Sequence, residues 1–153
     1  MKVPYVYNVR MANACHGKGF CNKPMPDLIV EQLTREFPTR GEPLVVHDDG
    51  HQIRCFAHVS DVVHAVTRLM DTPQAMGQVF NIGSDQPVSI LELAKRVIAV
   101  SQSKSSLKFQ SYTEAYDADF EDVRRRVPDL SRLKKMIDFT PRYDLDAIIR
   151  ELA

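Results

Sequence analysis

Hydrophobic positions recur at helical spacing over residues 60–71. Ser60 and Asp61 stand at the start of this stretch, where a side-chain oxygen can accept hydrogen bonds from free backbone N–H groups. The pattern therefore predicts an amphipathic helix that buries one stripe of apolar side chains. That stripe is expected to hold Val62, Val63, Val66, Leu69 and Met70.

Capping and apolar spacing predict further helices. Residues 89–92 read Ser-Ile-Leu-Glu, a capping box in which the serine and the glutamate side chains each satisfy an orphan backbone N–H group. A helix is therefore expected to begin there and to run to about Val100. Shorter helices are predicted over residues 27–37, 129–137 and 144–152.

Runs rich in β-branched and aromatic residues predict strands between these helices. Residues 43–47 and 52–58 flank a turn signal at 48–50, so these two strands are expected to form a hairpin. Residues 5–11 are the one candidate for a parallel-sheet strand followed by a loop. The remaining strands are predicted over residues 78–83 and 107–112. This mixed order of strands and helices predicts an α/β or α+β fold.

The composition is that of a soluble globular protein. The chain has 153 residues, which suits one domain, and 44% of them are hydrophobic and 26% charged. Twenty basic residues balance twenty acidic ones, so the overall charge indicates neither nucleic acid nor an anionic membrane as a partner. Three cysteines without paired spacing argue against a disulfide framework. With no membrane-spanning apolar run and no signal-peptide pattern, the expected location is cytoplasmic.

The sequence patterns for a metal site, a dinucleotide loop or a cysteine nucleophile are weak. His47 and His51 stand four residues apart but straddle the predicted turn, and no set of ligands has a recognisable spacing. Residues 17–22 begin like a dinucleotide-binding loop but lack its third glycine. Nothing in the sequence singles out a histidine partner for Cys15 or Cys55, and a buried structural cysteine is the usual case. We therefore expect no metal site in this chain.

Arginines offer the more specific candidate chemistry. Residues 124–126 are three consecutive arginines, which form either a solvated charge run or a site for a dianion. Guanidinium groups match phosphate oxygens two at a time, which favours phosphate as that dianion. Arg54 lies within a predicted apolar strand, so its side chain either faces solvent or points into a cleft toward an anion. The residues alone leave both alternatives open.

The stretch from Arg40 to Leu93 resembles the extended short-chain dehydrogenases that act on nucleotide sugars. Residues 41–62 follow the pattern G-x-P-L-x-V-x-G-D-G-x-Q-x-R-[DS]-[FY]-x-[HY]-V-x-D-V, with Asp48 in place of the first glycine of G-D-G and Cys55 at the [DS] position. Residues 79–84 (VFNIGS) resemble the next strand of the family, and residues 89–93 (SILEL) resemble the start of its next helix. These motifs occur in the order and spacing of the family.

The resemblance extends to both ends of the chain, where residues 9–13 (VRMAN) resemble V-R-x-[FY]-N and residues 126–131 (RVPDLS) resemble R-x-P-D-[IL]-[ST]. In this family the asparagine after the strand, the arginine of Q-x-R and the arginine before P-D contact the diphosphate and nucleotide of the sugar donor. The resemblance therefore implies that Asn13, Arg54 and Arg126 bind a nucleotide sugar, either a UDP-sugar or a dTDP-sugar.

The resemblance also implies the fold. It predicts an α/β, partial Rossmann-type fold, namely a C-terminal substrate-binding lobe with a small mixed sheet and helices. Residues 1–153 are expected to form this single lobe, in which residues 1–25 supply the last strand and loop of the otherwise absent Rossmann half. The N-terminal, dinucleotide-binding half of the family carries G-x-x-G-x-x-G for NAD and a catalytic Y-x-x-x-K, and neither pattern occurs in this sequence.

These missing motifs limit the expected activity. The complete family enzyme is expected to use NAD, whereas this chain alone is expected to bind no cofactor, to contain no catalytic residue and to convert no nucleotide sugar. A separate NAD-binding chain or a homo-oligomer is expected to cover the apolar face and strand edge that the absent half would bury.

Three functional hypotheses follow. The chain is the nucleotide-sugar-binding part of an NAD-dependent epimerase, dehydratase or decarboxylase, with motifs that favour UDP-glucuronate decarboxylases and dTDP-glucose 4,6-dehydratases. Alternatively, it is a non-catalytic nucleotide-sugar-binding module, or an inert truncated fragment kept as a folded scaffold. Calorimetry with UDP-sugars distinguishes the two binding hypotheses from the inert fragment.

Overall fold

The computed structural model of the chain describes residues 8–11, 43–115 and 123–152. The predicted helix over 27–37 lies outside these residues. The chain forms two compact units. Among the described residues, unit 1 contains 8–11, 55–87 and 127–144, and unit 2 contains 43–54, 88–115, 123–126 and 145–152.

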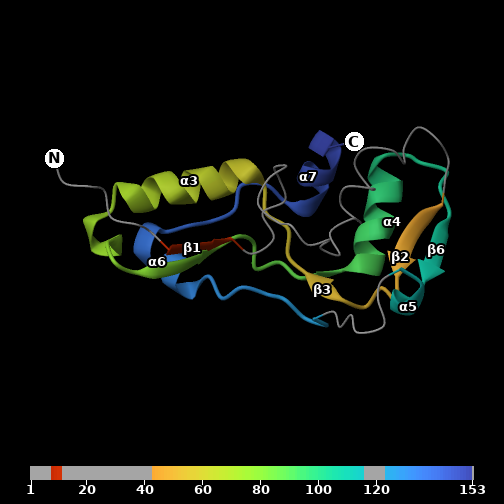
Figure 1. Cartoon of the computed structure of the whole chain (residues 1–153). Helices are drawn as coiled ribbons and strands as arrows, with labels where there is room; N and C mark the ends of the chain where they lie inside the picture. The colour runs from red at the N-terminus through yellow and green to blue at the C-terminus, as the bar shows by residue number, and fades with distance from the viewer. Residues whose placement is uncertain (1–7, 12–42, 116–122, 153) are drawn as a thin grey trace. The chain divides into compact units, whose positions relative to one another are not determined.

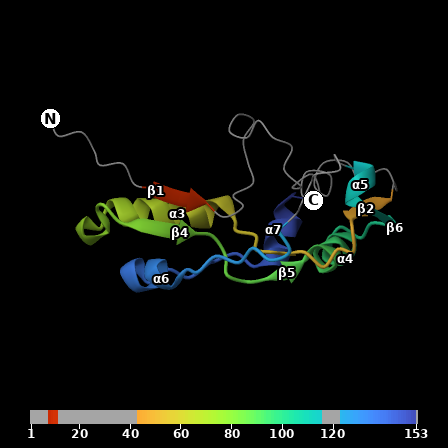
Figure 2. The ribbon, with the colours of Figure 1, turned by 60° about the horizontal axis from the view of Figure 1, so that its bottom comes forward.

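Unit 1 is built on two parallel strands, β1 (Asn8–Met11) and β4 (Val79–Ile82), which pair over their whole length. The connection between them includes helix α3 (Val59–Met70) and the short 3-10 helix η1 (Pro73–Ala75). Helix α3 runs alongside the strand pair, and helix α6 (Ser131–Ile137) packs beside β4 (Figures 1 and 2).

A single buried cluster forms the core of unit 1, and α3 contributes its inner face. Val62 and Leu69 are buried there as predicted, and Val66 packs against the cluster. Val63 and Met70 were also predicted on this stripe, but they are 58% and 61% exposed, because each follows a buried residue and lies about 100° further round the helix. The cluster comprises Val62, Ala65, Leu69, Ala75, Phe80, Ile82, Leu130, Leu133, Ile137 and Phe139.

Helix α3 is capped by a residue that the sequence pattern did not indicate. His58 has extended backbone angles, and its Nδ1 accepts a hydrogen bond from the backbone N–H of Ser60 at 3.2 Å. The predicted cap at Ser60-Asp61 is therefore wrong, because both residues already lie within the helix. Asp61, only 2% exposed, makes different contacts, which are described below.

Unit 2 contains a second parallel pair, β2 (Leu44–His47) and β6 (Leu107–Gln110). Helix α4 (Ile90–Val100) packs on β2, and helix α7 (Leu145–Leu152) packs on α4 (Figure 1). The predicted capping box at the start of α4 is confirmed, because Ser89 Oγ accepts a hydrogen bond from the Glu92 N–H at 3.1 Å. A short helix that the sequence did not predict, α5 (Tyr112–Ala115), follows β6.

The predicted hairpin between residues 43–47 and 52–58 is wrong. The turn itself forms, with Asp48 at φ 55° and Gly50 at φ 69°. However, β2 pairs with β6, and the second strand shortens to β3 (Ile53–Arg54), which pairs antiparallel with β5 (Val88–Ser89). The side-chain Nε2–H of Gln52 donates to the His47 carbonyl at 3.0 Å. In a hairpin, that carbonyl would accept a backbone N–H instead.

The observed architecture confirms the predicted α/β class, with small sheets and covering helices. Its two parallel pairs show that residues 44–47, 79–82 and 107–110 are parallel strands as well as residues 8–11. None of the described helices is long and apolar enough to cross a membrane.

Candidate anion-binding site

The run of three arginines lies directly beside β3 in unit 2. The N–H of Ile53 donates to the Arg124 carbonyl at 2.8 Å, and the N–H of Arg126 donates to the Ile53 carbonyl at 3.0 Å. These bonds form a parallel bridge between Ile53 and Arg125. Residues 124–126 therefore continue the small β3–β5 sheet on its other edge.

This register brings together the backbones of two of the three predicted site residues. Bridge partners Ile53 and Arg125 point to the same side of a sheet, so the alternation of an extended backbone predicts that Arg54 and Arg126 share the opposite side. The two arginines are 72 residues apart in the sequence and become neighbours only through this ladder. Asn13, the third predicted residue, lies outside the described part of the chain.

Arg54 and Arg126 differ sharply in their surroundings. Arg54 is 5% exposed, and its Nη1 donates to the backbone carbonyls of Val123 at 2.8 Å and Ile53 at 3.0 Å. It therefore helps to hold the arginine segment against β3. Arg126 is exposed, and its side chain makes no hydrogen bond or ion pair within the described ranges. Arg126 thus presents a cation at the surface, while Arg54 also has a structural role.

Arg124 is paired with the turn that follows β2. Its Nη1 lies 2.7 Å from Asp49 Oδ2, and its Nη2 lies 3.5 Å from Asp48 Oδ2. A backbone hydrogen bond from His51 and the side-chain bond from Arg124 together lower the pKa of Asp49, and the bond to Asp49 raises the pKa of Arg124. The arginine run is therefore divided: Arg124 is neutralised by the protein, and Arg125 and Arg126 are exposed.

A buried polar cluster anchors α5 to the same turn. Gln52 is 2% exposed, and its Nε2 donates to the His47 carbonyl at 3.0 Å and to the Tyr112 hydroxyl at 2.5 Å. The rings of His47 and Tyr112 lie nearly parallel, at an interplanar angle of 12°. Burial lowers the pKa of His47. Local sequence patterns missed this cluster because Gln52 and Tyr112 are 60 residues apart.

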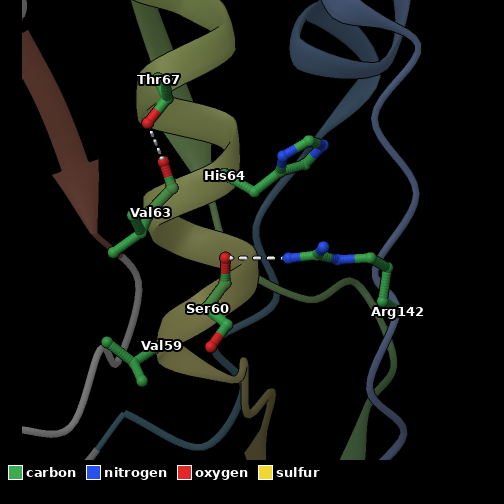
Figure 3. A pocket seen from close by; sticks show the side chains of 6 residues that line it. All are labelled: Val59, Ser60, Val63, His64, Thr67 and Arg142. Carbon is green, nitrogen blue, oxygen red and sulfur yellow. Dashed lines mark hydrogen bonds between the residues drawn. The ribbon is translucent and has the colours of Figure 1, made fainter.

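An open groove of about 390 Å³ lies along α3 in unit 1, and it contains none of the predicted site residues (Figure 3). Its one arginine, Arg142, donates from Nε to Asp61 Oδ1 at 3.1 Å and from Nη2 to the Ser60 carbonyl at 3.2 Å. Because the Asp61 carboxylate neutralises this guanidinium, the groove is a poor anion site. Its lining is Val59, Ser60, Val63, His64, Thr67 and Arg142.

Other candidate chemistry finds little support in the described residues. Among them no group of three or more histidine, cysteine, aspartate or glutamate side chains is arranged to hold a metal ion. The Cys55 side chain is buried, 2% exposed, which suits packing better than nucleophilic attack. The arginine segment beside β3 is thus the strongest candidate site.

Comparison with known proteins identifies the family. A family model described as GDP-mannose 4,6 dehydratase matches residues 17–152. UDP-N-acetyl-alpha-D-glucosaminuronate decarboxylase of Bacillus cytotoxicus is 35% identical over 112 residues, and UDP-glucuronic acid decarboxylase 2 of Arabidopsis thaliana is 35% identical over 106 residues. These matches cover 73% and 69% of this chain.

A solved structure agrees with this assignment. MoeE5, in complex with UDP-glucuronic acid and NAD, superposes with a TM-score of 0.72 at 28% identity over 95% of this chain. The chain spans only part of each relative: 35% and 22% of the two decarboxylases and 44% of MoeE5. The resemblance drawn from the sequence is confirmed, and the chain belongs to the GDP-mannose 4,6 dehydratase family, among the NAD-dependent nucleotide-sugar epimerases, dehydratases and decarboxylases.

Proposed function

We propose that this chain is the nucleotide-sugar-binding part of such an enzyme, and that Arg54 and Arg126, with Asn13, bind the diphosphate of a UDP-sugar. The observation that carries the proposal is the backbone ladder that brings Arg126 beside the strand of Arg54. Arginine side chains that share one side of a small sheet, as the alternation of the backbone predicts for Arg54 and Arg126, can offer paired donors to phosphate oxygens.

The relatives favour a UDP-linked uronic acid as the substrate class. Both decarboxylases are named for such sugars, and MoeE5 was solved with UDP-glucuronic acid. A uronic acid adds a carboxylate to the two phosphates, so the ligand is strongly anionic. Exposed Arg125 and Arg126 give this part of unit 2 a matching charge.

The chemical step is assigned to residues that this sequence does not contain. Neither the glycine-rich NAD motif nor Y-x-x-x-K occurs in it. In the complete enzyme, NAD would supply the hydride chemistry, bound either by a separate chain or by another part of a longer protein. We expect that enzyme to act in the cytoplasm. Incubated alone with NAD and UDP-, dTDP- or GDP-sugars, the 153-residue chain is expected to form no product. Any turnover would contradict this assignment.

Calorimetry with UDP and UDP-glucuronate tests the binding role. Arg126→Ala is the informative change, because Arg126 is exposed and its removal leaves no cavity. Loss of one charge-assisted contact of about 1.5–3 kcal/mol predicts a roughly 10- to 150-fold weaker Kd. Arg125→Ala is the matched control, since it removes the same charge from the neighbouring residue, and its Kd should change less than about threefold.

Two outcomes would overturn the proposal. If the wild-type chain binds neither ligand, the inert-fragment hypothesis gains instead. If Arg125→Ala weakens binding as much as Arg126→Ala, the arginines attract anions without forming a site. Arg54→Ala is a poorer test, because Arg54 also bonds the backbone of Val123, and its loss disturbs the fold as well as any ligand. Arg54→Lys, which keeps the charge, is the better variant at that position.

A further inference from the structure

We propose that Asp49 is a positioning residue for anion binding, because it holds Arg124 and thereby fixes the course of residues 124–126. The inference rests on the proposed function, since it assigns Asp49 a role in presenting Arg126 to the same ligand. Asp49 itself would not touch the ligand. It would act through Arg124, two residues before Arg126.

The carboxylate of Asp49 is fixed from two directions. Its Oδ1 accepts the backbone N–H of His51 at 2.8 Å, which leaves Oδ2 facing Arg124 Nη1 at 2.7 Å. Asp48 Oδ2 adds a longer contact of 3.5 Å to Arg124 Nη2. The guanidinium therefore meets a pair of carboxylates, one of them already oriented by its own turn.

Backbone hydrogen bonds fix the turn against the start of helix α4. The Leu91 N–H donates to the Gly50 carbonyl at 2.9 Å, and the Ile90 N–H donates to the Gln52 carbonyl at 3.0 Å. The turn is thus bonded to the first turn of α4, the helix that packs on β2. Because the turn is fixed, its residue Asp49 can hold the Arg124 side chain in a defined position.

Residues 49–52 also form a hydrogen bond to the start of helix α5. Gln52 binds the Tyr112 hydroxyl at the start of α5, and Asp49 binds Arg124 just before Arg126. Asp49 within the turn and Gln52 two residues after it thus bond the arginine run and the start of α5, respectively. Asp49 is the better residue to test, because it is exposed, whereas Gln52 is 2% exposed and its replacement would disturb the interior.

Positioning and simple electrostatics predict opposite signs for one substitution. Asp49→Asn removes a negative charge near the arginine run, so Coulomb attraction alone would make an anion bind more tightly. If Asp49 acts by positioning, the same change releases Arg124, lets residues 124–126 shift, and makes an anion bind more weakly. The sign of the effect therefore separates the two mechanisms.

The test is calorimetry of the full chain with UDP at low salt. Asp49→Asn and Arg124→Gln should each raise the Kd about two- to fivefold, the range expected for one exposed ion pair. The exchange variant, Asp49→Arg with Arg124→Asp, should return the Kd to within about twofold of wild type. Glu92→Gln is the control, because it breaks the exposed Glu92–Arg96 pair of unit 2 and should leave the Kd unchanged.

Each result of this experiment either supports or overturns the positioning role of Asp49. Tighter or unchanged binding by Asp49→Asn, or an exchange variant that binds no better than the single variants, overturns the positioning role while the proposed function stands. Absence of UDP binding by the wild-type chain overturns the proposed function and this inference with it. A weakening at both positions that the exchange reverses supports the inference, because a generally destabilised fold would not be rescued by reversing the charges.

Discussion

The two units each contain an arginine–aspartate pair, and the pairs differ in burial more than in distance. In unit 1, Arg142 Nε lies 3.1 Å from Asp61 Oδ1, and the side chains of Arg142 and Asp61 are 54% and 3% exposed. In unit 2, Arg124 Nη1 lies only 2.7 Å from Asp49 Oδ2, but the two side chains are 65% and 42% exposed. Because water reaches both members of the second pair, whereas Asp61 in the first pair is buried, the shorter contact contributes less to stability.

The contrast separates charges that hold the fold from charges that remain available to a ligand. Asp61 also accepts the backbone N–H groups of Arg142 and Tyr143, at 3.1 and 3.2 Å, so it fastens residues 142–143 to the start of α3. Asp49 holds a side chain at the surface, beside two arginines that are exposed. Burial and backbone partners, rather than the presence of an ion pair, indicate which charged residues stabilise the fold, and Arg54 is among them in addition to its proposed role.

The largest effect is expected from Asp61→Asn. The change removes a buried charge that accepts three N–H donors, so the free energy of unfolding should fall by about 3–4 kcal/mol. Chemical denaturation of the full chain measures it. Asp85→Asn is the control, because it breaks the partly exposed Lys134–Asp85 pair of the same unit and should cost less than about 1 kcal/mol. Equal losses in the two variants would refute the contrast based on burial.

A smaller effect is expected from the glycine in the turn of unit 2. At Gly50, φ is 69°, and an added Cβ would lie 2.8 Å from Val46 Cγ1 and 3.0 Å from Leu91 Cβ. Gly50→Ala should therefore destabilise the chain by about 2–3 kcal/mol through strain and overpacking together. Gly77 in unit 1 has a similar φ of 73° with nothing within 4 Å, so Gly77→Ala should cost only about 1 kcal/mol. Similar values for the two variants would show that the turn is not packed closely against α4.

The smallest effect concerns the pH dependence of stability at His47, the last residue of β2. Burial lowers the pKa of His47, so the unfolded chain binds more protons than the folded chain below the ordinary histidine pKa of about 6.5. Stability contributed by neutral His47 should therefore be complete above that pH and should decline as the pH falls below it. His47→Phe keeps a ring beside Tyr112 and removes the titration. An unchanged slope of stability against pH in this variant would exclude His47 as the titrating group.

Local patterns in the sequence correctly predicted the helices whose start and apolar face are determined by neighbouring residues. The capping box at Ser89 marked the start of α4, and apolar spacing located α3 to within a residue. The hairpin prediction failed because strand pairing is set by distant partners, here β6 for β2. The cap at His58 was missed because histidine is an uncommon N-cap residue, and Val63 and Met70 were placed inward because apolar residues occur on both faces of α3.

The candidate site was predicted only in part. Resemblance to a family selected Arg54 and Arg126, and the ladder beside β3 explains how residues so far apart become neighbours. No local rule pairs Arg124 with Asp49 across 75 positions, or Gln52 with Tyr112 across 60. The division of the arginine run into one paired and two exposed members therefore required the structure.

The most direct test follows the side-chain Nε–Hε signals of the arginines by NMR while UDP is added to the full chain. Binding at the proposed site predicts that the signals of Arg126 and Arg54 shift in a saturable way, while those of Arg142 and Arg96 stay in place. The opposite pattern, in which UDP leaves Arg54 and Arg126 unmoved or shifts every exposed arginine alike without saturation, would contradict a diphosphate site beside β3.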